Sequence, residues 1–147
     1  MANANTGQVV IAAIQDKIIP VEFSIAGSAP AGTIVTGTMY AYGLNNSATG
    51  TQFQVPAGSK YQLADMYVSG APAVDGQVIF NLNGIPQGEN LILSTLNTAN
   101  SGRAHITQPL VLGPSDVIQV SIVTLAANSS TTAVTDTLFL HFLQVPA

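Results

Sequence analysis

"TQFQVPAGSKYQL" (residues 51–63) and "TQPLVLGPSDVIQ" (residues 107–119) share one pattern: an apolar run, a corner that contains Pro and Gly, a polar step and then alternating apolar and polar residues. Pro fixes the backbone angle φ and lacks an N–H donor, and the neighbouring Gly permits a sharp change of direction. Each stretch therefore predicts a strand that stops, turns and restarts. Either corner alone is equally consistent with a simple hairpin, but a β-sandwich needs such corners where the chain passes between its sheets. Two of them favour a Greek-key or jelly-roll connection.

Elsewhere the chain alternates apolar and polar residues with a period of two, which is typical of β-strands. In "GQVIFNLNG" (76–84) the residues Val78 and Phe80 share a face, and the Asn83-Gly84 pair that follows is a strong hairpin signal. Clusters of Gly, Pro, Asn and Ser separate the apolar runs at short intervals. The sequence therefore predicts an all-β protein: a single antiparallel β-sandwich of jelly-roll or Greek-key topology with about eight strands.

We expect two segments, an N-terminal arm or first strand at residues 1–17 and the sandwich domain at residues 18–147. The apolar stretch "QVVIAAI" (8–14) is β-prone and has to be covered, because an exposed segment of this kind aggregates. It is either the first strand of its own sandwich or an arm that adds a strand to a neighbouring subunit or to a shell. The candidate residues of a shell-contact arm are Val9, Val10, Ile11 and Ile14.

Charged residues are scarce, at 7% of 147 residues, whereas about 25% is typical of soluble domains. The basic residues are Lys17, Lys60 and Arg103, and the formal net charge is −4. So few cations could neutralise few phosphates, which argues against nucleic-acid binding and against docking on an anionic membrane. No apolar run approaches the ~18 residues of a membrane span. The absence of cysteine excludes thiol chemistry and disulfides.

The titratable residues form no pattern that predicts catalysis. The chain has two histidines, His105 and His141, and seven scattered carboxylates. It lacks the H-x-H, H-E-x-x-H, Asp-x-Asp and G-x-S-x-G motifs of metal sites and hydrolases. Asp75 and Asp116 fall in predicted turns, which Asp favours. We therefore expect no enzymatic activity, no catalytic residue, no cofactor and no metal.

The stretch "TDTLFLHFLQV" (135–145) is apolar on both faces of a predicted strand. One face of such a strand packs inside the sandwich, and a second subunit is the natural cover for the other. The sequence thus predicts a homo-oligomer. The candidate interface residues are Phe139, His141, Leu143 and Val145.

His141 itself allows three interpretations. We favour a buried, hydrogen-bonded histidine of the core. A metal ligand would need partners, and His105 is the only other histidine. A stack of His141 side chains near a symmetry axis is the third hypothesis.

Aromatic residues give no signal for a sugar-binding platform. The chain has no Trp, and its four tyrosines lie within strand patterns, so we expect them to pack in the core or on a sheet. They are Tyr40, Tyr42, Tyr61 and Tyr67. The two Asn-x-Ser sequons, at Asn45 and Asn128, lie in predicted loops, and we interpret them as chance matches in a chain rich in Asn and Ser.

The pattern "FQVPAGSKYQL", followed by "PLVLGPSDVIQV" and an apolar last strand, resembles small jelly-roll virion proteins, most of all the capsid decoration (cement) proteins of tailed phages. The resemblance covers residues 18–145. It implies a trimer on the outer capsid surface, assembled in the host cytoplasm, that stabilises the shell by bridging subunits of the major capsid protein and grips its neighbours with a terminal arm. It supplies no catalytic residues.

Two further hypotheses remain beside a decoration protein. One is a small single-jelly-roll capsid subunit, although such subunits often carry a basic arm and residues 1–16 contain no Lys or Arg. The other is a sugar- or receptor-binding β-sandwich module of a fibre or of a secreted protein.

Overall fold

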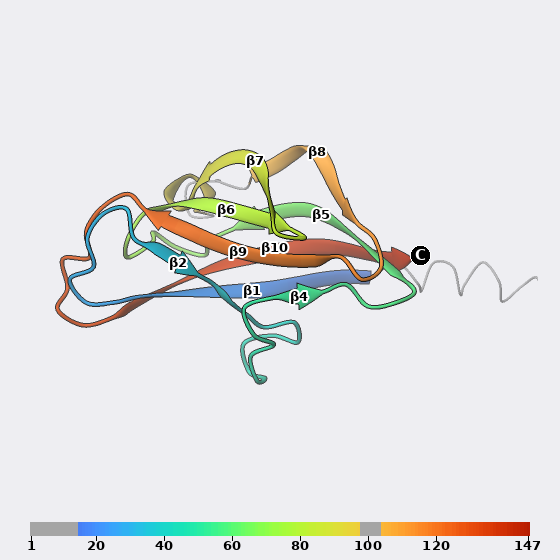
Figure 1. Ribbon diagram of the computed structural model, residues 1–147, viewed down its shortest axis with the longest axis horizontal. Coiled ribbons are helices and arrows are strands. Elements are labelled where there is room, and N and C mark those ends of the chain that lie inside the picture. The colour runs from blue at the N-terminus through green and yellow to red at the C-terminus, as the bar shows by residue number, and fades with distance from the viewer. Residues whose placement is uncertain (1–14, 98–103) are drawn as a thin grey trace, which may run out of the picture.

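Two antiparallel sheets pack face to face in the computed structural model, which describes residues 15–97 and 104–147 (Figure 1). The first sheet has the strand order β3-β1-β10-β5-β8, with β1 (Gln15–Ile25), β3 (Thr38–Met39), β5 (Ser59–Tyr67), β8 (Ala104–Leu112) and β10 (Val134–Pro146). The second has the order β2-β9-β6-β7, and β4 pairs with β9; its strands are β2 (Ile34–Thr36), β4 (Phe53–Gln54), β6 (Gly76–Leu82), β7 (Ile85–Ile92) and β9 (Val117–Thr124).

This arrangement is the predicted antiparallel sandwich with jelly-roll topology. The described part of the chain forms ten strands rather than the expected eight or so. The difference arises because β2, β3 and β4 are short strands beside the seven longer ones. One short 3-10 helix, η1 (Leu93–Leu96), links β7 toward β8. Within the described ranges, no helix has the length and hydropathy that a membrane span requires.

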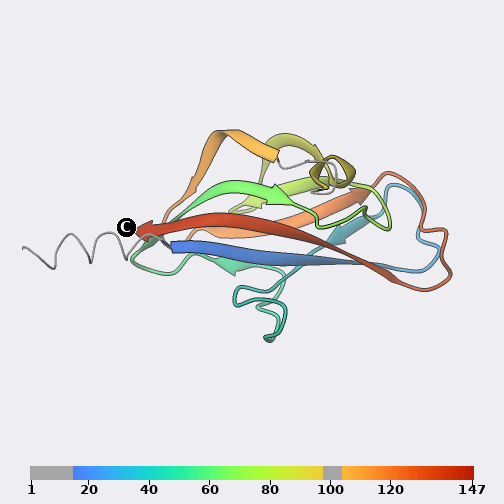
Figure 2. The same ribbon diagram turned by 180° about the vertical axis from the view of Figure 1, so that it is seen from behind.

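Both Pro-Gly corners carry the chain from one sheet to the other, as expected. The corner at residues 55–58 joins β4 of the second sheet to β5 of the first, and the corner at residues 113–116 joins β8 of the first sheet to β9 of the second. Gly58 has φ +82°, which is the left-handed conformation that glycine tolerates. The two corners lie at the same end of the sandwich, which is also the end where the C-terminus lies (Figure 2).

The Asn83-Gly84 pair forms the predicted hairpin between β6 and β7. Both residues have positive φ, 51° and 80°, as a two-residue turn between right-twisted strands requires. The Asn83 side chain also accepts a hydrogen bond from the Val117 amide (2.9 Å), which ties the hairpin to the start of β9.

The stretch 32–43 differs from one regular strand. It divides at Gly37, so that β2 pairs with β9 in the second sheet and β3 pairs with β1 in the first. A Cβ atom at Gly37 would lie 2.2 Å from a Val21 methyl group and 2.9 Å from the Phe23 ring. Only glycine lets the backbone pass this close to the core, and this is the physical reason for the division.

The core lies between the sheets and is built from alternating residues of each long strand, as the period of two predicts. On β10 the buried apolar residues are Leu138, Leu140 and Phe142, all 0% exposed. On β9 they are Ile118, Val120 and Ile122, and on β6 Val78 and Phe80.

The predicted boundary between arm and domain is partly within the described residues. Residues 15–17 belong to β1, since Gln15 pairs with Gln144 at the end of β10. The arm residues Val9, Val10, Ile11 and Ile14 lie outside the described residues. Their role as a shell-contact arm stays a prediction.

Candidate functional site: the outer face of the first sheet

The candidate interface residues all lie on the outer face of the first sheet. Strand β10 is central in this sheet, and its core face is fully buried. The alternate residues Phe139, His141, Leu143 and Val145 point away from the core and are half-buried. The predicted set therefore shares one face, and this face is free of contact with the second sheet.

Neighbouring strands extend the apolar character of this face. Ile18 of β1 and Val111 of β8 are 46% and 53% exposed, which is high for residues of their size. Phe139 stacks on Tyr67 of β5, with ring centroids 5.1 Å apart and an interplanar angle of 14°. The face thus presents aliphatic and aromatic side chains from four adjacent strands.

A charged cluster lies within this apolar surface. His141 Nε2 is 2.9 Å from Asp16 Oδ1 on β1, and His141 Nδ1 is 3.3 Å from Asp65 Oδ1 on β5. The ring is 24% exposed. The expectation of a core histidine is therefore wrong: Phe142, the next residue, takes the core position, and the pleat turns His141 outward.

His105 lies opposite this cluster in the sheet register. Its Cα atom pairs with that of Asp65 across β5 and β8, while its side chain is outside the described set. No group of three His, Cys, Asp or Glu side chains that could hold a metal ion occurs among the residues that the structure describes.

Asp136 and Asp75 connect separate segments of the chain through hydrogen bonds. Asp136, which is 6% exposed, accepts hydrogen bonds from the amides of Ala73 (2.6 Å) and Val74 (3.1 Å). Asp75 accepts hydrogen bonds from the hydroxyl of Ser94 (2.6 Å) and from its amide (3.0 Å). Both carboxylates therefore have a structural role.

Asp116 organises the second Pro-Gly corner. Its carboxylate accepts hydrogen bonds from the Asn83 side chain (3.0 Å) and from the Gly113 amide (2.8 Å). These bonds lower the pKa of Asp116 from its ordinary value of 3.8, and the bond from the Asn83 side chain has the larger effect. The turn position predicted for this residue is confirmed.

The tyrosines divide into packed and exposed residues. Tyr61 is buried between Phe53 and Phe142, and burial raises the pKa of its phenol. Tyr40 hydrogen-bonds to the Glu22 carboxylate, which raises the pKa of Tyr40. Tyr42 contradicts the packing expectation, because it is 78% exposed.

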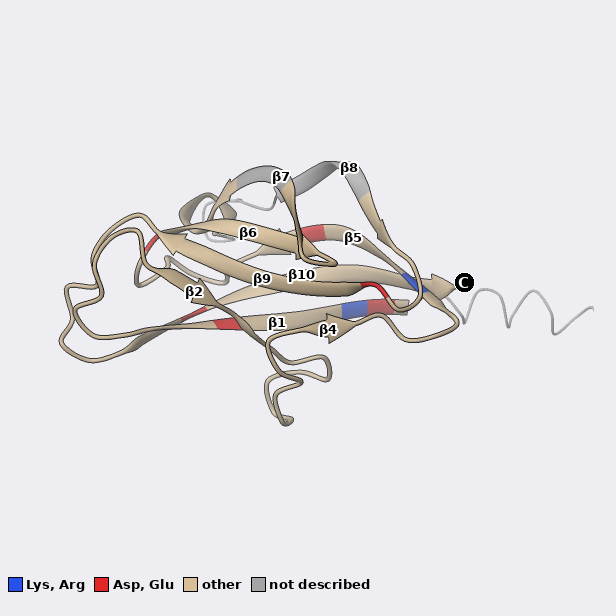
Figure 3. Ribbon diagram, viewed as in Figure 1, with Lys and Arg blue, Asp and Glu red and all other residues tan. Residues whose placement is uncertain are grey.

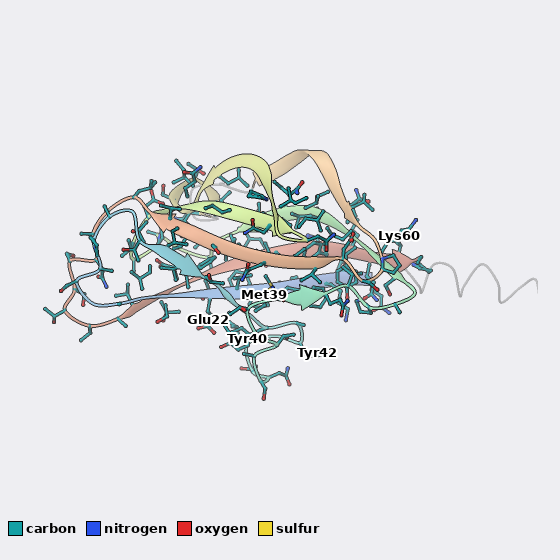
Figure 4. The ribbon with its side chains drawn as sticks, in the orientation of Figure 1. Glu22, Met39, Tyr40, Tyr42 and Lys60 are labelled. Carbon is teal, nitrogen blue, oxygen red and sulfur yellow. The ribbon has the colours of Figure 1, made fainter. Side chains whose placement is uncertain are left out.

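Tyr42 stands on a loop that projects from the sandwich between β3 and β4 (Figure 4). Four of the hydrogen bonds that order this loop are Gly43 N to Tyr40 O, Asn46 N to Gly43 O, Thr49 N to Met39 O, and the Asn46 side chain to Tyr42 O. The loop leaves the sheet after β3 and so carries Tyr42 away from the strand pattern that its sequence suggested.

Asn128, the first residue of one sequon, is 4% exposed. Its side-chain amide donates to the carbonyl oxygens of Ala26 (3.0 Å), Thr132 (3.3 Å) and Ile25 (3.4 Å). A buried amide nitrogen that makes these bonds is not accessible for glycosylation, which agrees with the interpretation of this sequon as a chance match.

Charge is sparse over the molecule (Figure 3). Strands β6 and β9 carry no charged residue at all in their sequences. On the outer face of the first sheet, the carboxylates of Asp16 and Asp65 lie beside the His141 ring. Of this site, the β10 residues were predicted, whereas Asp16, Asp65, Ile18 and Tyr67 were not, because their proximity depends on the pairing of strands far apart in sequence.

Comparisons with known proteins leave the family open: no protein-family model and no curated protein sequence matches the chain. Two crystal structures of murine APRIL, at pH 8.0 and pH 8.5, match 89% of this chain with 100% of theirs, at 17% identity and TM-scores of 0.37 and 0.40. The Agl-KA catalytic domain matches 84% of this chain with 21% of its own, at 13% identity and a TM-score of 0.27. The fold assignment therefore rests on the strand order and register of this chain.

Proposed function

We propose that the protein is a homo-oligomeric structural protein that self-associates, as a trimer, through the outer face of the first sheet. One observation carries this proposal: β10, the central strand, is apolar on the face that the sandwich leaves uncovered. Ile18 and Val111 extend that surface across the sheet with exposures of 46% and 53%. A second copy of the chain would remove these side chains from water, at about 25 cal/mol for each Å² of apolar surface buried.

We further propose that the oligomer is a decoration protein on the outside of a virion. The support is the resemblance described above, the low charge, and the structural use of Asp75, Asp116 and Asp136. In this role the protein stabilises the shell by burying apolar area across joints between subunits of the major capsid protein. The role requires neither catalysis nor a cofactor.

The test is binding to particles together with mass in solution. The full chain and a chain that begins at Gln15 would be incubated with capsids that lack the protein and then sedimented. We expect both chains to form the same oligomer, and only the full chain to sediment with capsids. Failure of the full chain to bind any capsid, with the oligomer intact, would leave self-association standing and remove the virion role.

Tyr42 favours a second candidate, a sugar- or receptor-binding module. An exposed ring on an ordered loop, beside Asn45 and Asn46, could stack on a sugar while amides bond its hydroxyls. A glycan-binding screen of wild type and Tyr42→Ser tests this candidate. Binding that Tyr42→Ser abolishes would favour it over decoration.

A further inference from the structure

Three side chains from three adjacent strands meet on the outer face of the first sheet. The His141 ring on β10 lies between the carboxylates of Asp16 on β1 and Asp65 on β5, at 2.9 Å and 3.3 Å. Each ring nitrogen faces a carboxylate oxygen. A neutral imidazole has one N–H, whereas the imidazolium has two. His141 Nε2 is hydrogen-bonded to Asp16, and the positive charge of a protonated ring attracts both carboxylates.

We propose that protonation of His141 controls self-association through this face. The inference rests on the proposed function, since it needs the face to be buried in the oligomer. With the ring protonated, the three side chains carry a formal charge of −1, and with the ring neutral they carry −2. Burying the three side chains with the ring neutral leaves more uncompensated negative charge, which opposes assembly.

The free subunit should respond only weakly. Asp16 is 72% exposed and His141 24%, so water screens their attraction before assembly. A second subunit on this face excludes that water and strengthens each electrostatic interaction. The proton therefore matters mainly in the assembled state.

Few other charges face His141 in the described part of the sheet. On β1, Glu22 is in register with Thr137, which lies four residues before His141 on β10. On β5, Lys60 is in register with Val145 near the end of β10. On β8, His105 pairs in register with Asp65. Among the described residues, the ring of His141, when protonated, is the cation that lies between Asp16 and Asp65.

The direction of the pH effect follows from proton uptake. If association binds protons, the dissociation constant rises as the pH rises. The window is the range from about pH 5 to about pH 8, in which histidine ordinarily changes charge. The change approaches tenfold per pH unit for each subunit that takes up one full proton, so we expect about a tenfold or larger weakening across the window.

Sedimentation at fixed ionic strength, from about pH 5.5 to about pH 8.5, tests the inference. The chain has two histidines, which makes His105→Gln the matched control for His141→Gln. We expect wild type and His105→Gln to dissociate as the pH rises, and His141→Gln to show a flat dissociation constant. Asp16→Asn, which removes one negative charge, should associate more tightly than wild type at about pH 8.5. Thermal melts verify that each variant folds.

The outcomes separate the inference from the proposed function. A wild-type oligomer whose dissociation constant is flat overturns the inference alone, and so does a pH dependence that His105→Gln abolishes and His141→Gln retains. A wild-type monomer at every pH overturns the inference and the self-association proposal together.

Discussion

The amide of Ser115 donates a hydrogen bond to the carbonyl oxygen of Val55 at 3.0 Å, and the Val55 amide donates to the carbonyl oxygen of Asp116 at 2.8 Å. These bonds join the two Pro-Gly corners, which are separated by some sixty residues of chain. The same end of the sandwich thus holds both crossings between the sheets. Ser115 has φ 70°, so the second corner is stabilised in a conformation that a non-glycine residue seldom adopts.

Asp116 should make the joined corners sensitive to acid. Asp116→Asn replaces one of the two accepting oxygens with an NH2 group, so that one of the bonds from Asn83 and Gly113 is lost, and we expect the free energy of unfolding to fall by about 1 kcal/mol at neutral pH. The lowered pKa of Asp116 means that its ionised form stabilises the fold above pH 3.8 and that this contribution disappears as the pH falls through the lower, folded value. Urea unfolding should show the difference between wild type and variant closing in strong acid. A constant difference at all pH values contradicts this assignment.

Gly37 should not tolerate a side chain. Gly37→Ala places a methyl group against Val21 and Phe23, and we expect a loss of about 1–3 kcal/mol, the range typical of overpacking. Gly70→Ala is the matched control, because a Cβ atom at Gly70 meets nothing within 4 Å and its φ is not in the left-handed region. Equal unfolding midpoints for the two variants in urea would show that the crossing at Gly37 is not tightly packed.

Asn128 should be a stabilising residue rather than a glycosylation site. Asn128→Ala leaves the carbonyl oxygens of Ala26 and Thr132 without this buried donor, and we expect a loss of about 2 kcal/mol. Asn45→Ala, in the exposed sequon, should change stability by less than about 0.5 kcal/mol. Thermal denaturation of both variants makes the comparison, and an unchanged melting temperature for Asn128→Ala would count against the role of its hydrogen bonds.

The two faces of β10 should respond differently to the same charge. Phe142→Asp buries an unpaired carboxylate in the core and should unfold the subunit, at a cost of more than about 4 kcal/mol. Phe139→Asp lies on the outer face and should lose chiefly the Tyr67 stack, about 1 kcal/mol. Circular dichroism of the purified variants distinguishes them. A folded Phe142→Asp, or an unfolded Phe139→Asp, would reverse the assignment of faces.

The sequence predicted the features that depend on local chemistry. The Pro-Gly corners, the Asn83-Gly84 hairpin and the alternating core residues of β6 and β9 follow from turn preferences and the period of two, and the structure confirms them. The apolar outer face of β10 could also be predicted, because only one face of a strand that is apolar on both faces can pack in the core. Which side faces the core could not be read from a stretch in which both are apolar.

The features that were missed depend on contacts between distant segments. Asp16 and His141 lie 125 residues apart in sequence and meet only because β1 pairs with β10 in a particular register. Tyr42 matches a strand pattern, yet the ordered turns after β3 take it out of the sheet. Gly37 gave no sign in the sequence that its lack of a side chain lets the chain pass the core.

Sedimentation of the wild-type chain and of Phe139→Asp at micromolar concentration is the most direct test of self-association through the outer face of the first sheet. We predict that wild type sediments as an oligomer, with three times the 15.1 kDa subunit mass, and that Phe139→Asp sediments as a folded monomer. A wild-type species of 15.1 kDa, or a folded Phe139→Asp that keeps the wild-type oligomer, would contradict the proposed interface.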